Sequence, residues 1–259
     1  MIGITIRIAI HNTACACALA FSLPAGAMVG GAQPATDAVA RAVVMLTGSH
    51  GTFCSGVALA PMLVLTAAHC VLPGADYKLI EFDAARQPAL KDVAAVARHP
   101  EFDVNAVLRH RVTADVALLK LAAPAKTAAA ALAPPALPIA AGDRFIVAGY
   151  GLAVHGDGKT GGTVRAATLA ATGQPGTLQI RLVDPATKGE RAGLGACTGD
   201  SGAPVFRDVG GALAVVGVVS WSTGPGLSDG CGGLTGVTPL ARYRGWIVGQ
   251  AGKMGSPLQ

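Results

Sequence analysis

The sequence predicts an all-β protein with many tight turns. Glycine and proline are abundant, at 35 and 16 of the 259 residues, and both residue types favour turns. The apolar residues make up 51% of the chain and fall into many short runs between these turn residues, which is typical of β-strands. A chain of this length can bury an ample core, either as one large domain or as two smaller ones.

In the first half, four apolar runs predict strands at residues 42–46, 54–59, 63–66 and 116–121. The run at 63–66 leads into a short turn that carries His69, and Asp115 directly precedes the run at 116–121. Residues 122–138 are rich in alanine and proline, which predicts an extended crossover. We therefore place the boundary between two halves of the molecule there.

In the second half, strands are expected at residues 144–149, 178–183 and 212–221. The glycine-rich segment 154–163 lacks the Lys-Ser/Thr pair of a phosphate-binding loop and is interpreted as a surface loop. The apolar spacing of Leu240, Tyr243, Trp246 and Ile247 predicts a C-terminal helix at residues 239–250.

Residues 1–27 have the pattern of an export signal. Arg7 gives a positive start, residues 8–23 are mostly apolar, and the small residues at 25–27 fit a signal-peptidase site. An uncut membrane anchor is the alternative interpretation. No later run of about 20 apolar residues occurs, so no membrane span is expected in the mature part, which we expect to be secreted or periplasmic.

The distribution of charge argues against nucleic-acid binding, and the spacing of cysteines and histidines argues against a metal site. The net charge is +5, but the basic residues are scattered along the sequence, whereas nucleic-acid binding needs a concentrated basic patch. Cys15 and Cys17 lie in the expected signal, and the four remaining cysteines permit three disulfide pairings. Four reduced cysteines are the alternative. No CxxC or HxxxH spacing occurs, so no metal site is expected.

The strongest chemical signal is the segment Ala-Cys-Thr-Gly-Asp-Ser-Gly-Ala-Pro at residues 196–204. Gly199 and Gly202 permit a tight turn that exposes the Ser201 hydroxyl and directs backbone N–H groups to one point. A serine needs a base to become a nucleophile, and the base needs an orienting acid. His69, in Thr-Ala-Ala-His-Cys, and Asp115, in Ala-Asp-Val-Ala-Leu-Leu-Lys, are the candidates.

These three motifs, in the order His69, Asp115, Ser201, resemble those of the chymotrypsin-like (trypsin-fold) serine peptidases. The resemblance extends from about Met28 to the C-terminal segment. It implies two six-stranded antiparallel Greek-key β-barrels, at about residues 28–138 and 139–259, followed by a C-terminal helix. It also implies the disulfides Cys54–Cys70 and Cys197–Cys231.

The same resemblance assigns roles to the site residues. His69 would take the proton of Ser201, Asp115 would hold the imidazole, and the N–H groups of Gly199 and Ser201 would form the oxyanion hole. This chemistry requires neither a metal nor an organic cofactor.

By the same resemblance, Gly195 lies at the base of the specificity pocket, with Ser220, Ser222 and Gly236 around it. Without an acid at position 195, a buried Lys or Arg of the substrate would lack a partner. We therefore expect cleavage after apolar residues. Ser222 stands where glycine is common in this family, and Ala203 also replaces a usual glycine.

Met28–Val29–Gly30–Gly31 resembles the mature N-terminus of these peptidases, with Met28 in place of the usual Ile or Val. In the family, the freed α-amino group forms a buried ion pair with the acid before the nucleophile, here Asp200. No Lys or Arg lies between Arg7 and Met28. We therefore expect signal peptidase itself to make the activating cut.

The function expected from the sequence is that of a monomeric, exported serine endopeptidase acting on proteins or peptides. The alternative is a catalytically silent binding protein on the same scaffold, because a fold alone does not fix a function. An esterase of another fold is disfavoured, since it would need a Gly-x-Ser-x-Gly elbow and the order Ser, Asp, His.

Overall fold

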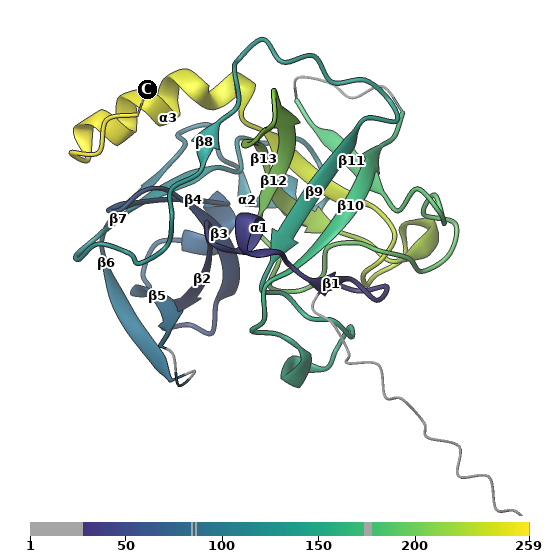
Figure 1. Cartoon of the computed structure of the whole chain (residues 1–259), viewed down its shortest axis with the longest axis horizontal. Coiled ribbons are helices and arrows are strands. Elements are labelled where there is room, and N and C mark those ends of the chain that lie inside the picture. The colour runs from purple at the N-terminus through teal and green to yellow at the C-terminus, as the bar shows by residue number, and fades with distance from the viewer. Residues whose placement is uncertain (1–27, 84, 86, 174–177, 259) are drawn as a thin grey trace, which may run out of the picture.

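The computed structural model describes residues 28–83, 85, 87–173 and 178–258. The export signal expected at residues 1–27 lies outside the described residues. Figure 1 shows two β-barrels side by side, with the C-terminal helix alongside the N-terminal barrel.

The N-terminal barrel closes in the strand order β2-β3-β4-β7-β6-β5, and all of its pairings are antiparallel. The apolar runs expected as strands are present here, with bounds that differ by one or two residues. Two further strands, β5 and β6, were not expected from the sequence; β6 is largely exposed, although it contains the apolar run at residues 93–97. The strands are β2 (Val43–Gly48), β3 (Phe53–Ala60), β4 (Leu63–Thr66), β5 (Tyr77–Phe82), β6 (Pro88–Arg98) and β7 (Ala117–Leu121).

The second barrel closes in the order β9-β10-β11-β14-β13-β12, because β12 pairs back to β9. Two short strands lie outside this ring: β1 (Gln33–Pro34) pairs with β10, and β8 (Ala131–Leu132) pairs with β13 in parallel. The prediction of two six-stranded antiparallel barrels is confirmed. The ring strands are β9 (Arg144–Gly149), β10 (Arg165–Ala171), β11 (Ile180–Val183), β12 (Pro204–Val209), β13 (Ala212–Ser222) and β14 (Thr235–Pro239).

The predicted C-terminal helix is present, but it begins later than expected. Pro239 pairs with Gly217 as the last residue of β14, so the helical segment starts with the 3-10 turn η4 (Ala241–Tyr243) and continues as α3 (Arg244–Lys253). Tyr243 and Ile247 are buried, as their spacing predicted. The other short helical segments are α1 (Asp37–Ala40), η1 (Ala68–Val71), α2 (Val104–Leu108), η2 (Gly158–Thr160) and η3 (Pro225–Leu227).

Each barrel has its own core, and a third core lies between the barrels and the helix. Leu46, Leu79 and Leu119 pack inside the N-terminal barrel, whereas Phe145 and Leu182 pack inside the second. The third cluster joins residues of both barrels to α3, including Leu118, Val218 and Ile247. This shared core fixes the two barrels against each other, which matters because the candidate site takes residues from both.

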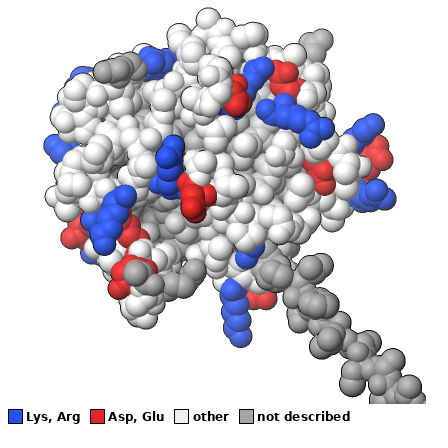
Figure 2. Space-filling view, viewed as in Figure 1, with Lys and Arg blue, Asp and Glu red and all other residues white. Residues whose placement is uncertain are grey.

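None of the helices in the described part of the chain is long and apolar enough to cross a membrane. Figure 2 shows charged side chains in small groups, often of mixed sign, separated by wide uncharged areas on this face.

Candidate active site

The local sequence around His69 folds into a buried strand followed by one turn of 3-10 helix. All four residues of β4 are buried, and so are Ala67 and Ala68 at the start of η1. The small alanine side chains let this turn lie against the protein interior. His69 is thereby held at the end of a rigid strand, with its side chain 20% exposed.

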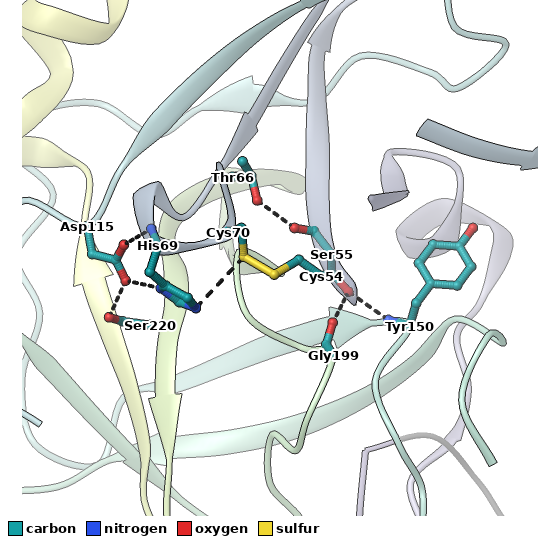
Figure 3. Close-up of a disulfide and its surroundings, with 9 residues drawn as sticks. All are labelled: Cys54, Ser55, Thr66, His69, Cys70, Asp115, Tyr150, Gly199 and Ser220. Carbon is teal, nitrogen blue, oxygen red and sulfur yellow. Dashed lines mark hydrogen bonds and ion pairs between the residues drawn. A yellow bond between two sulfur atoms is a disulfide. The ribbon is translucent and has the colours of Figure 1, made fainter. Parts of the chain in front are cut away.

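Asp115 holds His69 through two hydrogen bonds (Figure 3). The backbone N–H of His69 donates to Oδ1 of Asp115 at 2.9 Å, and the imidazole Nδ1 lies 2.8 Å from Oδ2. An ionised carboxylate only accepts hydrogen bonds, so Nδ1 carries the proton and Nε2 presents its lone pair. The arrangement therefore leaves Nε2 free to act as a base.

Asp115 is fully buried directly before β7, where a carboxylate needs hydrogen-bond donors. Its third donor comes from the other barrel: the Ser220 hydroxyl on β13 donates to Oδ2 at 2.5 Å. Ser220 was expected in the substrate pocket, and that assignment stays a prediction; its side-chain hydroxyl is hydrogen bonded to Asp115. Its function in positioning this carboxylate was missed, because no sequence pattern shows which way a serine on a strand points.

The turn that carries Ser201 requires glycine on both sides. Gly199 and Gly202 have φ values of +94° and +76°, in the left-handed region that favours glycine. A Cβ on Gly202 would lie 2.1 Å from Thr66 Oγ1 and 2.8 Å from the Ala67 nitrogen. The Ser201 turn is thus in direct contact with the segment that leads into His69.

Ser55, on β3, anchors this turn and was not identified from the sequence. Its N–H donates to the Ser201 carbonyl at 2.8 Å, and its hydroxyl donates to the Gly199 carbonyl at 2.8 Å. Thr66 in turn donates its hydroxyl to the Ser55 carbonyl. Figure 3 shows Ser55 between Thr66 and Gly199, beside the Cys54–Cys70 disulfide.

The turn of the nucleophile candidate lies against the segment that leads into the base candidate, but the described residues show no hydrogen bond between the side chains of Ser201 and His69. The Nε2 atom of His69 lies 3.8 Å from Cys70 Sγ. The N–H groups of Gly199 and Ser201 donate to no other described residue. These two donors are free to bind an oxyanion.

Asp200 is fully buried under the serine turn. Its carboxylate accepts from the N–H groups of Gly151 and Cys197, each at 2.9 Å. Burial raises the pKa of Asp200 to about 7, whereas the hydrogen bonds from the two N–H groups act to lower it. Gly149 and Gly151 leave the space for this carboxylate. A Cβ would lie 2.1 Å from the carboxylate at position 149 and 2.5 Å from it at position 151.

Met28, the proposed partner of Asp200, is also fully buried and packs in the core of the second barrel. In the full chain its nitrogen belongs to the peptide bond with Ala27. No described cation forms an ion pair with Asp200. The neighbouring Val29 pairs with Gly195 through an isolated β-bridge, so the start of the described chain lies against the expected pocket base.

The other expected pocket residues lie on the β13–β14 pair. Trp221 is paired with Gly236, and Ser222 with Thr235. The indole of Trp221 occupies the space in front of Gly236, where a Cβ would meet the ring at 2.0 Å. The pairing of β13 with β12 ends at Val218, so residues 220–222 have a free edge on that side among the described residues.

Both disulfides that the resemblance implies are present. Cys54–Cys70 ties β3 to η1, and Cys197–Cys231 ties the segment before the serine turn to the loop before β14. Within the described residues, one metal-like trio occurs, formed by Cys54, His69 and Cys70. Its sulfurs are bonded to each other, so they cannot act as thiolate ligands.

The comparisons with known proteins agree with this geometry. The protein-family model described as Trypsin matches residues 28–247, a span that includes every strand of both barrels. A comparison with curated proteins found no match.

Proposed function

The chain belongs to the trypsin family, and on that premise we propose that it is an exported serine endopeptidase that uses Ser201, His69 and Asp115. The observation that carries the proposal is the double hydrogen bond from His69 to the buried Asp115, with the Ser201 turn packed against the segment before His69. Substrates are proteins or peptides, as in the family.

In the proposed reaction, His69 Nε2 takes the proton of the Ser201 hydroxyl while Oγ attacks the carbonyl carbon of the scissile bond. The C–N bond then breaks, and the leaving amine takes the proton from His69. Water, deprotonated by His69, attacks the acyl-enzyme and releases the acid together with free Ser201. Asp115 stabilises the imidazolium in both steps.

The oxyanion of each tetrahedral intermediate would lie between the N–H groups of Gly199 and Ser201. Their lack of another acceptor supports this assignment. Loss of one such donor typically costs about 3 kcal/mol in the transition state. No metal or organic cofactor enters the proposed chemistry.

We propose that the substrate backbone pairs with the free edge of β13 at residues 220–222. A peptide added as a strand gains affinity from main-chain hydrogen bonds, and its side chains are then selected by pockets. Gly195 offers no charge to a basic side chain, so we propose that cleavage follows apolar residues.

Export and activation are also part of the proposal. The two disulfides fit an extracellular or periplasmic protein. Cleavage after Ala27 would free the Met28 amine, and this cation would compensate the buried Asp200. In this proposal residues 1–27 form the signal, and 28–138 and 139–259 form the two halves of the enzyme.

The second candidate is a silent binding protein on the same scaffold. The missing hydrogen bond between Ser201 and His69 favours it. Ala203 does not, because its methyl group is fully buried in the second core and faces Gly149, which has no side chain.

Labelling with a fluorophosphonate probe tests the proposal. The exported protein is first sequenced from its N-terminus and then exposed to the probe, with Ser201→Ala as the control. Labelling of the wild type and not of Ser201→Ala supports an activated serine. A protein that begins at Met28, remains folded and does not react supports the silent scaffold. A peptide library then measures the side-chain preference at the scissile bond.

A further inference from the structure

Two basic side chains, those of His110 and Arg181, contact the ring of Trp221, outside the proposed catalytic residues. The imidazole of His110 stacks on the indole, with ring centroids 4.8 Å apart and an interplanar angle of 21°. The guanidinium carbon of Arg181, on β11, lies 6.0 Å from the centroid of the same ring. Arg109 and Arg111 flank His110 in sequence, and both are exposed. Three of these basic residues are consecutive in the sequence, at positions 109–111, and the fold brings Arg181 to the same indole ring.

The backbone after α2 holds His110 in this place. Its N–H donates to the Val107 carbonyl at 2.9 Å, and the Arg111 N–H donates to the Ala106 carbonyl at 2.8 Å. His110 has a φ of +51°, a conformation that residues other than glycine rarely adopt. The loop therefore presents the imidazole in a defined orientation.

Within the described residues, none of these basic groups forms an ion pair. The ion pairs of the described residues involve other cations: His69, Lys78, Lys91 and Arg207. Arg181 Nε donates to the side chain of Gln179, which carries no charge. The two acids closest in sequence to the loop are engaged elsewhere: Asp115 accepts from His69 and Ser220, and Asp103 accepts the Asn105 N–H at the start of α2. An anionic partner would therefore meet uncompensated positive charge.

An unsatisfied donor lies at the same place. Trp221 is only 7% exposed, and its indole N–H finds no acceptor among the described residues. Buried donors of this kind usually have a partner; because the nitrogen atom is itself buried, a substrate group could reach it only after the side chains over it move. The residue also lies on the free edge of β13 directly after Ser220, where the proposed substrate strand would pass.

We infer that Trp221, His110, Arg109, Arg111 and Arg181 form a subsite that selects acidic side chains on the N-terminal side of the scissile bond. The inference rests on the proposed function, because the peptide must lie along β13. A glutamate or aspartate of the substrate would receive hydrogen bonds and charge from these donors. The apolar pocket at Gly195 and this cationic subsite would act on different residues of one peptide.

Paired peptides test the subsite. Each pair shares an apolar residue before the scissile bond and carries either Glu or Gln at the second, third or fourth position before it. We expect at least one position at which Glu raises kcat/KM about fivefold over Gln, as for a single exposed charge pair. Because exposed pairs are screened by salt, the ratio falls towards one at about 0.5 M NaCl.

Charge-removing variants locate the effect. Arg109→Gln, Arg111→Gln and Arg181→Gln should each lower the Glu/Gln ratio, because each lowers kcat/KM of the Glu peptide more than that of the Gln peptide. Arg144→Gln removes the same charge from β9, which pairs with β10 and β12, and should leave the ratio unchanged. Efficient cleavage with no Glu preference at any position would overturn the subsite and leave the peptidase proposal intact.

Binding separates the subsite from catalysis. The chain has two tryptophans, Trp221 and Trp246, so a Ser201→Ala, Trp246→Phe protein reports Trp221 fluorescence alone. The Glu peptide should change this fluorescence at concentrations about fivefold lower than the Gln peptide, even if the wild type cleaves neither. Equal binding of the two peptides, or an equal response to inorganic phosphate alone, would overturn the inference.

Discussion

The Ser220 hydroxyl donates to Oδ2 of Asp115 at 2.5 Å, from the second barrel to an acid of the first. The same oxygen lies 2.8 Å from His69 Nδ1. The orientation of the proposed base thus depends on contact between the barrels and on the core cluster that joins them.

Substitution of Ser220 should therefore reduce catalysis more than folding. Ser220→Ala removes one donor from a buried carboxylate, and a hydrogen bond to a charged group contributes about 1.5–3 kcal/mol. We expect kcat to fall about tenfold to a hundredfold, whereas Ser220→Thr, which keeps a hydroxyl, retains part of the activity. Steady-state kinetics on an apolar peptide measures the change, and thermal unfolding of the same samples controls for folding. A wild-type kcat in Ser220→Ala would show that this hydrogen bond has no catalytic role.

The second prediction concerns the serine turn and compares alanine substitutions at two glycines. Gly202→Ala places a methyl group 2.1 Å from Thr66 Oγ1 and retains a positive φ. Gly210→Ala has a similar φ of +65° but open space around it. Backbone strain alone costs about 1–2 kcal/mol, so Gly210→Ala should lose that much stability in urea unfolding.

Gly202→Ala should lose clearly more stability than Gly210→Ala and should no longer react with the fluorophosphonate probe. The comparison isolates the steric contact, because both variants carry the same backbone strain. Equal losses in the two variants, with labelling retained, would mean that the contact between Gly202 and the segment before His69 is unimportant.

The sequence was sufficient for the three motifs, because each motif combines a special residue with a buried strand or a glycine turn, and the two barrels followed from the family resemblance that these motifs carry. It was not sufficient for relationships between distant segments. Ser220 could not be assigned to Asp115, since the direction of its side chain depends on the pairing of β13 with β14. The stacking of His110 on Trp221 depends on a loop with positive φ. Strand β6 was missed because most of its residues are exposed.

The buried Asp200 predicts different pH dependence before and after cleavage at Met28. Burial raises its pKa from 3.8 to about 7 in the uncut chain. Between these values the folded protein holds a proton that the unfolded chain has released, so a rise in pH favours unfolding. In a chain that begins at Met28, the freed amine should pair with Asp200, so that stability is no longer lost as the pH rises.

Urea unfolding at about pH 4.5 and pH 7.5 measures the effect on a chain that keeps a few residues before Met28 and on one that begins there. The extended chain should lose stability towards pH 7.5 relative to the cut chain. Asp200→Asn should abolish the difference, since the amide does not titrate. Identical pH dependence in the extended and cut chains would contradict the proposed ion pair.

His99 is expected to make the folded protein less stable as the pH falls, which is opposite in direction to the effect of Asp200. It lies before α2 and contacts two aromatic rings of the C-terminal segment, Tyr243 and Trp246, each at a centroid distance of 5.0 Å. The Glu101 N–H donates to its Nδ1, which requires that nitrogen to be unprotonated. Burial lowers the pKa of His99 below 6.5, with Glu101 raising it and Arg242 lowering it further.

As the pH falls below 6.5, the unfolded chain therefore takes up a proton at His99 before the folded protein does, and stability is lost. His99→Phe keeps an aromatic ring without a titrating group, so its stability should decline less between about pH 7 and pH 5 than that of the wild type. His50→Asn, at an exposed turn, should decline in parallel with the wild type. Parallel curves for wild type and His99→Phe in urea unfolding would exclude His99 as the source, whereas a flatter curve would place acid sensitivity at the contact between the N-terminal barrel and the C-terminal helix.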